Sequence, residues 1–174
     1  MSTKKDKFSL IEKKFMRVAI NLAKARQGLT GENPSVGCVL VKNDKIISIG
    51  QTGYGGRPHA ETNAINSSLE NLNGAKMYVT LEPCNHYGKT PPCTNSIIKS
   101  GIKEVFYSIN DIDKKVRGKS FKILNKQNIK VNVGILKDEA KELYESYIIN
   151  RKYNLPYVTA KIAISKNKLI YSEG

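Results

Sequence analysis

The chain has 174 residues, of which 40% are hydrophobic and 25% charged, and this composition predicts one globular domain that buries its own core. No apolar run approaches the roughly 18 residues that cross a bilayer, and the N-terminus lacks the apolar stretch of a signal peptide, so we expect a cytoplasmic protein without a membrane partner. The net charge of +14 is of the kind found in proteins that bind anionic partners such as nucleic acids.

The hydrophobic pattern predicts an alternation of helices and strands. An amphipathic helix over residues 8–26 comes first, with apolar side chains at helical spacing. Two strands follow at 36–41 and 46–49, joined by a tight turn over residues 42–45. The later elements are a helix at 59–69, a strand at 77–81, a helix at 91–100, a strand at 104–109, a helix at 116–126, a strand at 129–135 and a helix at 137–150.

Strands separated by helices of about ten residues predict right-handed crossovers and a largely parallel sheet. We therefore expect an α/β protein, a three-layer α/β/α domain with a mixed, mostly parallel sheet of about five strands that begins with an antiparallel hairpin. The predicted domain occupies residues 1–150. Residues 151–174 are predicted to be a linker followed by one further strand, LPYVTAKIAIS (155–165), which opens a second unit.

The three cysteines are an odd number without a secretory context, which favours metal binding or catalysis over disulfides. Cys38 lies within a predicted strand and is expected to be a small core residue. Cys84 follows Pro83 directly after a strand, and Cys93 follows two prolines at the start of a helix. The positions of Cys84 and Cys93 in a polar loop are typical of ligands.

His59, at another junction of loop and helix, completes a His/Cys/Cys set. Three protein ligands favour a catalytic zinc, whose fourth coordination position is open to water. His86 is the other candidate ligand, but its position between the cysteines suits a substrate contact equally well. Glu61 lies two residues after His59. Zinc deaminases combine such a ligand set with a non-ligand glutamate in the order H-x-E, then P-C-x-x-C. Here eight residues instead of two separate Cys84 from Cys93.

Three segments carry a more specific resemblance: NPSVGCVLV (33–41), GGRPHAE (55–61) and TLEPCNHYGKTPPC (80–93). Over residues 10–150 the chain resembles the deaminase domain of the bifunctional riboflavin-biosynthesis family, the diaminohydroxyphosphoribosylaminopyrimidine deaminases, which implies a cytidine deaminase-like fold. Residues 155–165 resemble the first strand of that family's NADPH-dependent reductase module. NADPH is implied only where a full reductase domain is present, either in the same chain or as a separate one.

The resemblance implies one zinc per chain, held by His59, Cys84 and Cys93. Zinc would lower the pKa of a water molecule that attacks the amino-bearing carbon of a pyrimidine, and Glu61 would carry the protons. The implied reaction converts 2,5-diamino-6-ribosylamino-4(3H)-pyrimidinone 5′-phosphate to 5-amino-6-ribosylamino-2,4-pyrimidinedione 5′-phosphate and ammonia. Homo-oligomers are also implied, because members of this family often self-associate.

The resemblance also implies substrate contacts. Asn33 is expected to bind the base or its ribosylamino group, while His86, Lys89 and Thr90 face the ribose phosphate. Lysine and threonine suit a dianionic phosphate because they supply charge and hydrogen-bond donors. Asp111 occupies a position that matches the family.

Two of the expected contacts depart from the family pattern. Asp113 replaces an asparagine that contacts substrate, and Lys114 partly compensates its charge. Thr52 stands where many members have a histidine. We expect deamination chemistry to be retained and substrate affinity to be altered.

The charge distribution bears on the alternatives. Residues 1–26 carry a net charge of +6, residues 27–113 carry −1 and residues 114–174 carry +9, and 24 of the 29 basic residues are lysines. A neutral middle segment and few arginines indicate a solvated lysine surface, so a nucleic-acid partner is not expected. The alternatives are a nucleic-acid or free-nucleoside deaminase of the same superfamily and an inactive zinc-binding scaffold; Glu61 argues against the scaffold.

Overall fold

The computed structural model describes residues 7–114, 116–168 and 170. The elements, in chain order, are α1 (Leu10–Lys24), β1 (Gly37–Lys42), β2 (Lys45–Gln51), the short 3-10 helix η1 (Tyr54–Gly56), α2 (Ala60–Asn66), β3 (Lys76–Leu81), α3 (Cys93–Ser100), β4 (Glu104–Ile109), α4 (Lys119–Lys126), β5 (Lys130–Val133), α5 (Lys137–Leu143) and α6 (Glu145–Tyr153). No helix in these ranges is long and apolar enough to cross a membrane.

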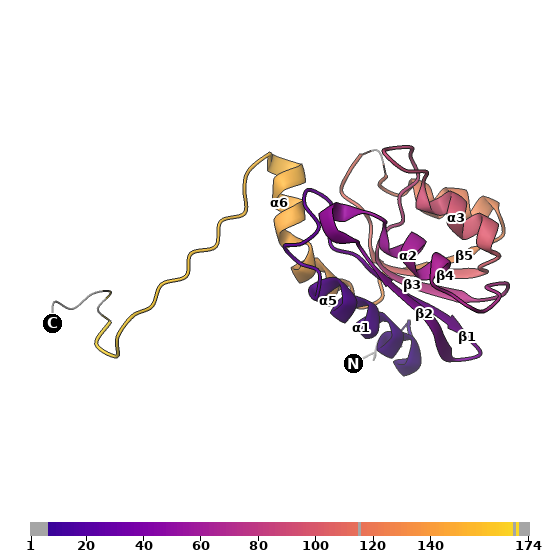
Figure 1. Cartoon of the computed structure of the whole chain (residues 1–174), viewed down its shortest axis with the longest axis horizontal. Coiled ribbons are helices and arrows are strands. Elements are labelled where there is room, and N and C mark those ends of the chain that lie inside the picture. The colour runs from indigo at the N-terminus through magenta and orange to yellow at the C-terminus, as the bar shows by residue number, and fades with distance from the viewer. Residues whose placement is uncertain (1–6, 115, 169, 171–174) are drawn as a thin grey trace, which may run out of the picture.

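The five strands form one sheet in the order β2-β1-β3-β4-β5 (Figure 1). β1 pairs antiparallel with both of its neighbours, whereas β3, β4 and β5 pair in parallel. β2 therefore runs in the same direction as these three strands, and β1 alone is reversed. The predicted mixed, mostly parallel sheet and the α/β class are confirmed.

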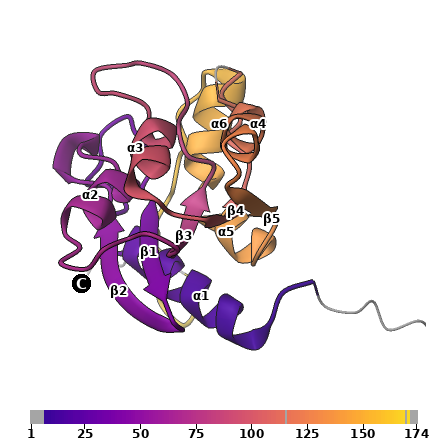
Figure 2. The same ribbon diagram turned by 90° about the vertical axis from the view of Figure 1, so that its right-hand side faces the viewer.

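The sheet is the middle of three layers. Along β1, Cys38 and Leu40 face one core cluster, while Val39 and Val41 face the other. Figure 2 shows α2, α3 and α4 over one face of the sheet, and α1 and α5 over the other. Alternate side chains of one strand thus support both helical layers, as expected for a buried central strand.

Local sequence explains several element boundaries. Ser9 and Glu12 form a capping box that begins α1, with the Glu12 side chain accepting from the Ser9 backbone N–H at 2.8 Å. Asn43 and Asp44 both adopt positive φ in the turn between β1 and β2, the conformation that two-residue hairpins favour. Gly101 ends α3 in the left-handed conformation.

Two glycines let helices lie directly against the sheet. A Cβ on Gly37 would be 1.9 Å from the Ala19 carbonyl oxygen of α1, and a Cβ on Gly50 would be 2.2 Å from the Ala60 carbonyl oxygen of α2. Side chains at these positions would push the helices outward. The contact at Gly50 places the first turn of α2 beside the edge strand.

The C-terminal part differs from the sequence-based expectation. The predicted helix at 137–150 is two helices, α5 and α6, separated at Tyr144, whose buried hydroxyl is 2.5 Å from the Thr80 Oγ1 atom. The buried hydrogen bond holds Tyr144 against β3, so the chain turns there. α6 continues to Tyr153, past the predicted domain boundary at residue 150.

Residues 155–165, predicted as a strand, are not part of a strand in the described structure. They extend away from the domain (Figure 1). Their apolar side chains are exposed, Val158 to 80% and Ile162 to 65%. The segment has strand-like sequence, but the described residues supply it with no neighbouring strand.

Replacing Gly37 with alanine is expected to destabilise the fold by about 2 kcal/mol or more, because the added methyl group overlaps the backbone of α1. The midpoint of urea denaturation measures this change. Gly88→Ala is the matched control, since its Cβ would have only the Arg57 Nη2 atom at 3.9 Å nearby. Equal midpoints for the two variants would contradict the close contact between α1 and β1.

Candidate active site

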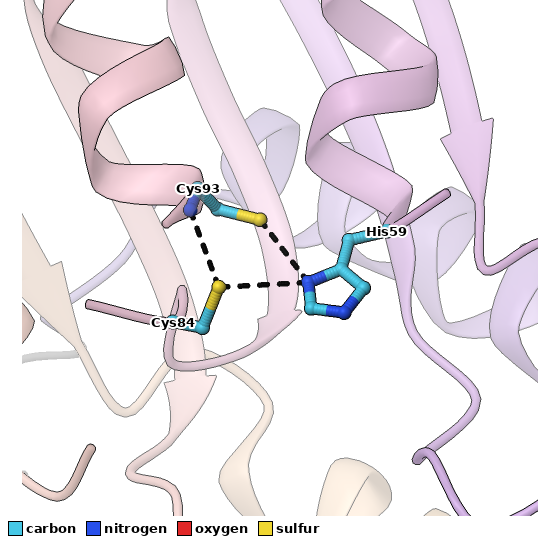
Figure 3. Close-up of side chains that lie close together, drawn as sticks. All are labelled: His59, Cys84 and Cys93. Atoms are coloured by element: carbon cyan, nitrogen blue, oxygen red, sulfur yellow. Dashed lines mark hydrogen bonds between the residues drawn. The ribbon is translucent and has the colours of Figure 1, made fainter. Parts of the chain in front are cut away.

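Three side chains that are distant in sequence meet at one end of the sheet. His59 immediately precedes α2, Cys84 follows β3, and Cys93 is the first residue of α3 (Figure 3). The carboxyl end of a parallel strand and the amino ends of the helices that follow lie at the same edge of an α/β sheet. The topology therefore brings these ligand candidates together.

Their distances fit a tetrahedral zinc ion. His59 Nδ1 is 3.3 Å from Cys93 Sγ and 3.5 Å from Cys84 Sγ, and all the ligand atoms lie within 4.8 Å of one another. Ligands held about 2.0–2.3 Å from a tetrahedral zinc are separated by roughly 3.5 Å. The three ligand atoms can therefore bind one zinc ion with little movement of the side chains. Among the described residues, the ligand set consists of these three side chains.

The electrostatics of the two thiols also suit a cation. A hydrogen bond from the Cys93 side chain, followed by one from His59, lowers the pKa of Cys84 to about 4. The backbone N–H of Cys93 donates to the same sulfur at 3.2 Å. The pKa of Cys93 is raised, first by its hydrogen bond to Cys84 and then by burial, which favours a proton on the Cys93 sulfur. A zinc ion would replace that proton, because zinc binds thiolates.

Glu61 lies in the first turn of α2 and is only 4% exposed. Burial, followed by the negative charge of Cys84, raises its pKa to about 7. Its carboxyl group is outside the three-residue ligand set but lines the same cavity as His59 and Cys84. The glutamate is thus placed to exchange protons beside the ligands.

The cavity above this group has a volume of about 140 Å³. It brings together most of the residues that the sequence predicts as substrate contacts. These are Asn33, Thr52, His86, Asp111 and Asp113. The Nδ1 atom of His86 is buried and has no hydrogen-bond partner in the described part of the chain, so it is available to a ligand.

Asn33 is held at the cavity by backbone contacts. Its Nδ2 atom donates to the Gly56 carbonyl oxygen at 3.2 Å, and its own carbonyl oxygen accepts from the Thr30 hydroxyl at 2.7 Å. Gly56 has φ +91°, and a Cβ there would be 2.2 Å from Asn33 Nδ2. The glycine therefore provides the space that Asn33 occupies.

Thr52 and Asp111 line the cavity and also bind the protein itself. The Thr52 hydroxyl accepts from the Val36 N–H at 2.9 Å and contacts the Pro34 carbonyl oxygen at 3.2 Å, which fixes the loop after Asn33. Asp111 Oδ1 accepts from the Asp113 N–H at 2.9 Å and from the Tyr147 hydroxyl at 3.0 Å. Both side chains position parts of the cavity wall.

Lys89 and Thr90 are exposed and are not among the cavity-lining residues. Thr90 is nevertheless linked to the cavity, because its Oγ1 atom accepts a 2.6 Å hydrogen bond from Nη1 of Arg57, which lines it. Glu82 also lines the cavity and accepts from the N–H groups of Gly118 and Ser120, tying that loop to the site.

The sequence analysis missed four polar lining residues. They are Arg57, Glu82, Tyr147 and Arg151. Arg57 lies inside the GGRPHAE segment and Glu82 inside TLEPC, so the motifs contained a signal for both. Tyr147 and Arg151 lie on α6, and only the folded arrangement brings that helix to the cavity.

Residues 10–109 match the family model described as the cytidine and deoxycytidylate deaminase zinc-binding region. The chain belongs to this deaminase family. The matched range contains all three ligand candidates and Glu61, and the expected cytidine deaminase-like fold is confirmed by solved structures.

Relatives within this family carry riboflavin-related names. The riboflavin biosynthesis protein RibD of Aquifex aeolicus is 44% identical over 88% of this chain and 43% of its own length. The diaminohydroxyphosphoribosylamino-pyrimidine deaminase of Buchnera aphidicola subsp. Schizaphis graminum is 43% identical over 82% of this chain and 97% of its own length. The chain thus spans less than half of the first relative and nearly all of the second.

Solved structures agree with the sequence relatives. Acinetobacter baumannii RibD superposes with a TM-score of 0.80 at 40% identity, covering 84% of this chain and 42% of that one. A second solved structure is a diaminohydroxyphosphoribosylaminopyrimidine deaminase/5-amino-6-(5-phosphoribosylamino)uracil reductase from Thermotoga maritima. It superposes with a TM-score of 0.78 at 43% identity, covering 84% of this chain and 43% of that chain. The resemblance to the riboflavin-biosynthesis deaminases is confirmed.

The ligand geometry generates a prediction about metal content. Cys84→Ser is expected to lose most of its zinc after dialysis, because a hydroxyl replaces the thiolate whose pKa is lowest. Elemental analysis by mass spectrometry measures the zinc content per chain. Cys38→Ala is the matched control, since Cys38 is a buried cysteine outside the ligand set. Equal zinc content in both variants would show that Cys84 is not a ligand.

Proposed function

We propose that the protein catalyses the hydrolytic deamination of 2,5-diamino-6-ribosylamino-4(3H)-pyrimidinone 5′-phosphate, an early step of riboflavin biosynthesis. The observation that carries the proposal is the His59, Cys84 and Cys93 group, with the buried non-ligand Glu61 at the same cavity. Family membership and relatives named for this deaminase support the assignment.

His59, Cys84 and Cys93 would hold one zinc ion per chain. When bound, zinc supplies a Lewis acid that makes water nucleophilic near neutral pH. The three residues occupy three of the four tetrahedral positions around zinc, so the fourth position is free for the reacting molecule beside Glu61. A structural site would instead close the fourth position with protein.

Glu61 carries the protons of the reaction. Its carboxylate accepts a proton from the attacking water, and the carboxyl group then delivers protons to the ring nitrogen and to the departing amine. The carbon that bore the amino group becomes a carbonyl, and one water molecule is consumed for each ammonia released. Burial of Glu61 keeps bulk water away from its carboxyl group.

The other polar residues of the cavity position the substrate. Asn33, whose amide is oriented by Gly56, binds the base or its ribosylamino group, and His86 offers its unpartnered Nδ1 atom. Asp111 and Asp113 come from the loop after β4, where Asp113 contributes a carboxylate in place of the family's asparagine. Thr52 positions the substrate indirectly, because its hydroxyl fixes the loop that follows Asn33.

Lys89 and Thr90, in the loop between the two cysteines, contribute to binding the ribose phosphate of the substrate. The hydrogen bond between Arg57 and Thr90 supports this proposal, because it joins the loop to a cavity-lining cation. Lys89 is exposed on the same loop, where its charge attracts a dianionic substrate.

We further propose that residues 1–150 are the deaminase domain and that residues 151–174 are a linker and the first strand of a reductase module. The exposed isoleucines of the extended segment support this, because apolar alternation is typical of a strand with a sheet to join. Relatives about twice as long as this chain also support it. The remainder of the reductase would be in the same polypeptide or in a separate one.

The central test is Glu61→Gln. We expect this variant to keep its zinc and to lose about 10²- to 10⁴-fold in turnover, because glutamine cannot transfer protons. Ammonia release from the pyrimidinone ribosylamine phosphate measures the rate, and cytidine and an anticodon-loop RNA serve as competing substrates. Unchanged turnover in Glu61→Gln would overturn the mechanism, and activity of the wild type on the RNA alone would overturn the substrate.

A second variant tests the domain division. Truncation after Asn154 is expected to change the free energy of unfolding by less than about 0.5 kcal/mol, because residues 155–168 are exposed. Thermal denaturation followed by circular dichroism at matched protein concentration measures the effect. A large loss of stability would place the segment within the deaminase domain.

A further inference from the structure

Two of the chain's five arginines line the catalytic cavity. Arg57 lies two residues before His59, whereas Arg151 lies on α6. Neither forms a salt bridge with a carboxylate in the ranges that the structure describes. Arginines that lack an acidic partner and line a concave site are available to an anionic ligand.

Arg57 is held in place by the loop between the two cysteines. Its Nη1 atom donates to Thr90 Oγ1 at 2.6 Å, and its Nη2 atom lies 3.9 Å from the position of a Cβ built on Gly88. A guanidinium group has five N–H donors, so most of them remain available after this bond. The loop thus fixes the direction of the group without using its full capacity.

Arg151 is oriented by a different contact. Its guanidinium carbon lies 5.7 Å from the centroid of the Tyr147 ring, and the Tyr147 hydroxyl donates to Asp111 at the cavity wall. The ring therefore connects the arginine to the loop after β4. None of these contacts occupies the N–H donors of Arg151.

The two arginines are more exposed than Glu61 at the same cavity, and Arg151 is also more exposed than His59 and Cys84. Glu61 is buried, and His59 and Cys84 are partly buried, whereas Arg57 is half-buried and Arg151 is exposed. A planar base can thus reach the ligands at the closed end, while a charged group stays hydrated at the mouth. Arginine suits that group when it is a phosphate, because its planar fork binds phosphate oxygens in pairs.

We propose that Arg57 and Arg151 form a phosphate clamp at the mouth of the cavity and make the site selective for phosphorylated pyrimidines. The clamp rests on the proposed deaminase function and adds residues from outside the cysteine loop. Thr90 serves it by orienting Arg57. Because Arg151 belongs to α6, the clamp joins the loop before α2 to the last helix of the described structure.

Activity measurements test the selectivity. The variants are Arg57→Gln and Arg151→Gln, with Arg17→Gln as the matched control, an exposed arginine of α1 paired with Glu139. For each, kcat/KM for ammonia release is measured with the pyrimidinone ribosylamine 5′-phosphate and with its dephosphorylated form. Each clamp variant is expected to lower the ratio of the two values by about 10- to 100-fold, chiefly through KM, because a charge-assisted hydrogen bond is lost.

The control is expected to keep the ratio of the wild type. Equal losses on both substrates would overturn the clamp and show a merely structural role. A ratio that falls in only one of the two variants would overturn the pairing of the arginines.

A binding measurement separates the clamp from the deaminase assignment. Titration calorimetry with ribose 5-phosphate is expected to show binding to the wild type and to Arg17→Gln, with affinity about tenfold weaker in each clamp variant. Wild-type protein that releases ammonia but does not bind ribose 5-phosphate would overturn the clamp alone. Wild-type protein that binds it through both arginines but releases no ammonia would overturn the deaminase assignment and keep the clamp.

Discussion

The contact between α2 and the edge of the sheet is the constraint on which the site depends. Gly50 has no side chain, so the backbone of α2 packs against β2 at a distance that a Cβ would forbid. The same turn of α2 carries Ala60, with His59 before it and Glu61 after it. A helix displaced by even 1 Å would separate the imidazole from the two thiols, because ligand distances around zinc tolerate only small errors.

The sequence predicted which local segments come together at the candidate site. H-x-E, the two proline-preceded cysteines and the strand before them lie in short segments whose order along the chain is also their order at the sheet edge. The α/β class and most elements were predicted from the spacing of hydrophobic residues and from the alternation of helices with strands. The hairpin turn was predicted from the polar residues between the first two strands, where Asn43 and Asp44 adopt positive φ. These predictions succeed because neighbouring residues determine backbone conformation and because crossovers are right-handed.

What the sequence did not predict depends on tertiary contacts. Tyr144 ends α5 because its hydroxyl meets Thr80, a residue 64 positions away, and the pattern over 137–150 contains no helix-breaking residue to signal this. The extended segment at 155–165 has the alternation of a strand, but strand formation needs a neighbour. Tyr147 and Arg151 line the cavity through the placement of α6, which local propensity does not encode.

α6 has two neighbours with different roles. On one side its residues form part of the cavity wall, and at its end the chain passes directly into the exposed segment that begins at residue 155. One helix therefore forms part of the cavity wall and also carries the start of the exposed segment. The three ligand candidates and Glu61 come from other elements, namely the start of α2, the loop after β3 and the start of α3, so the end of the domain contributes to the cavity wall and not to the ligand set.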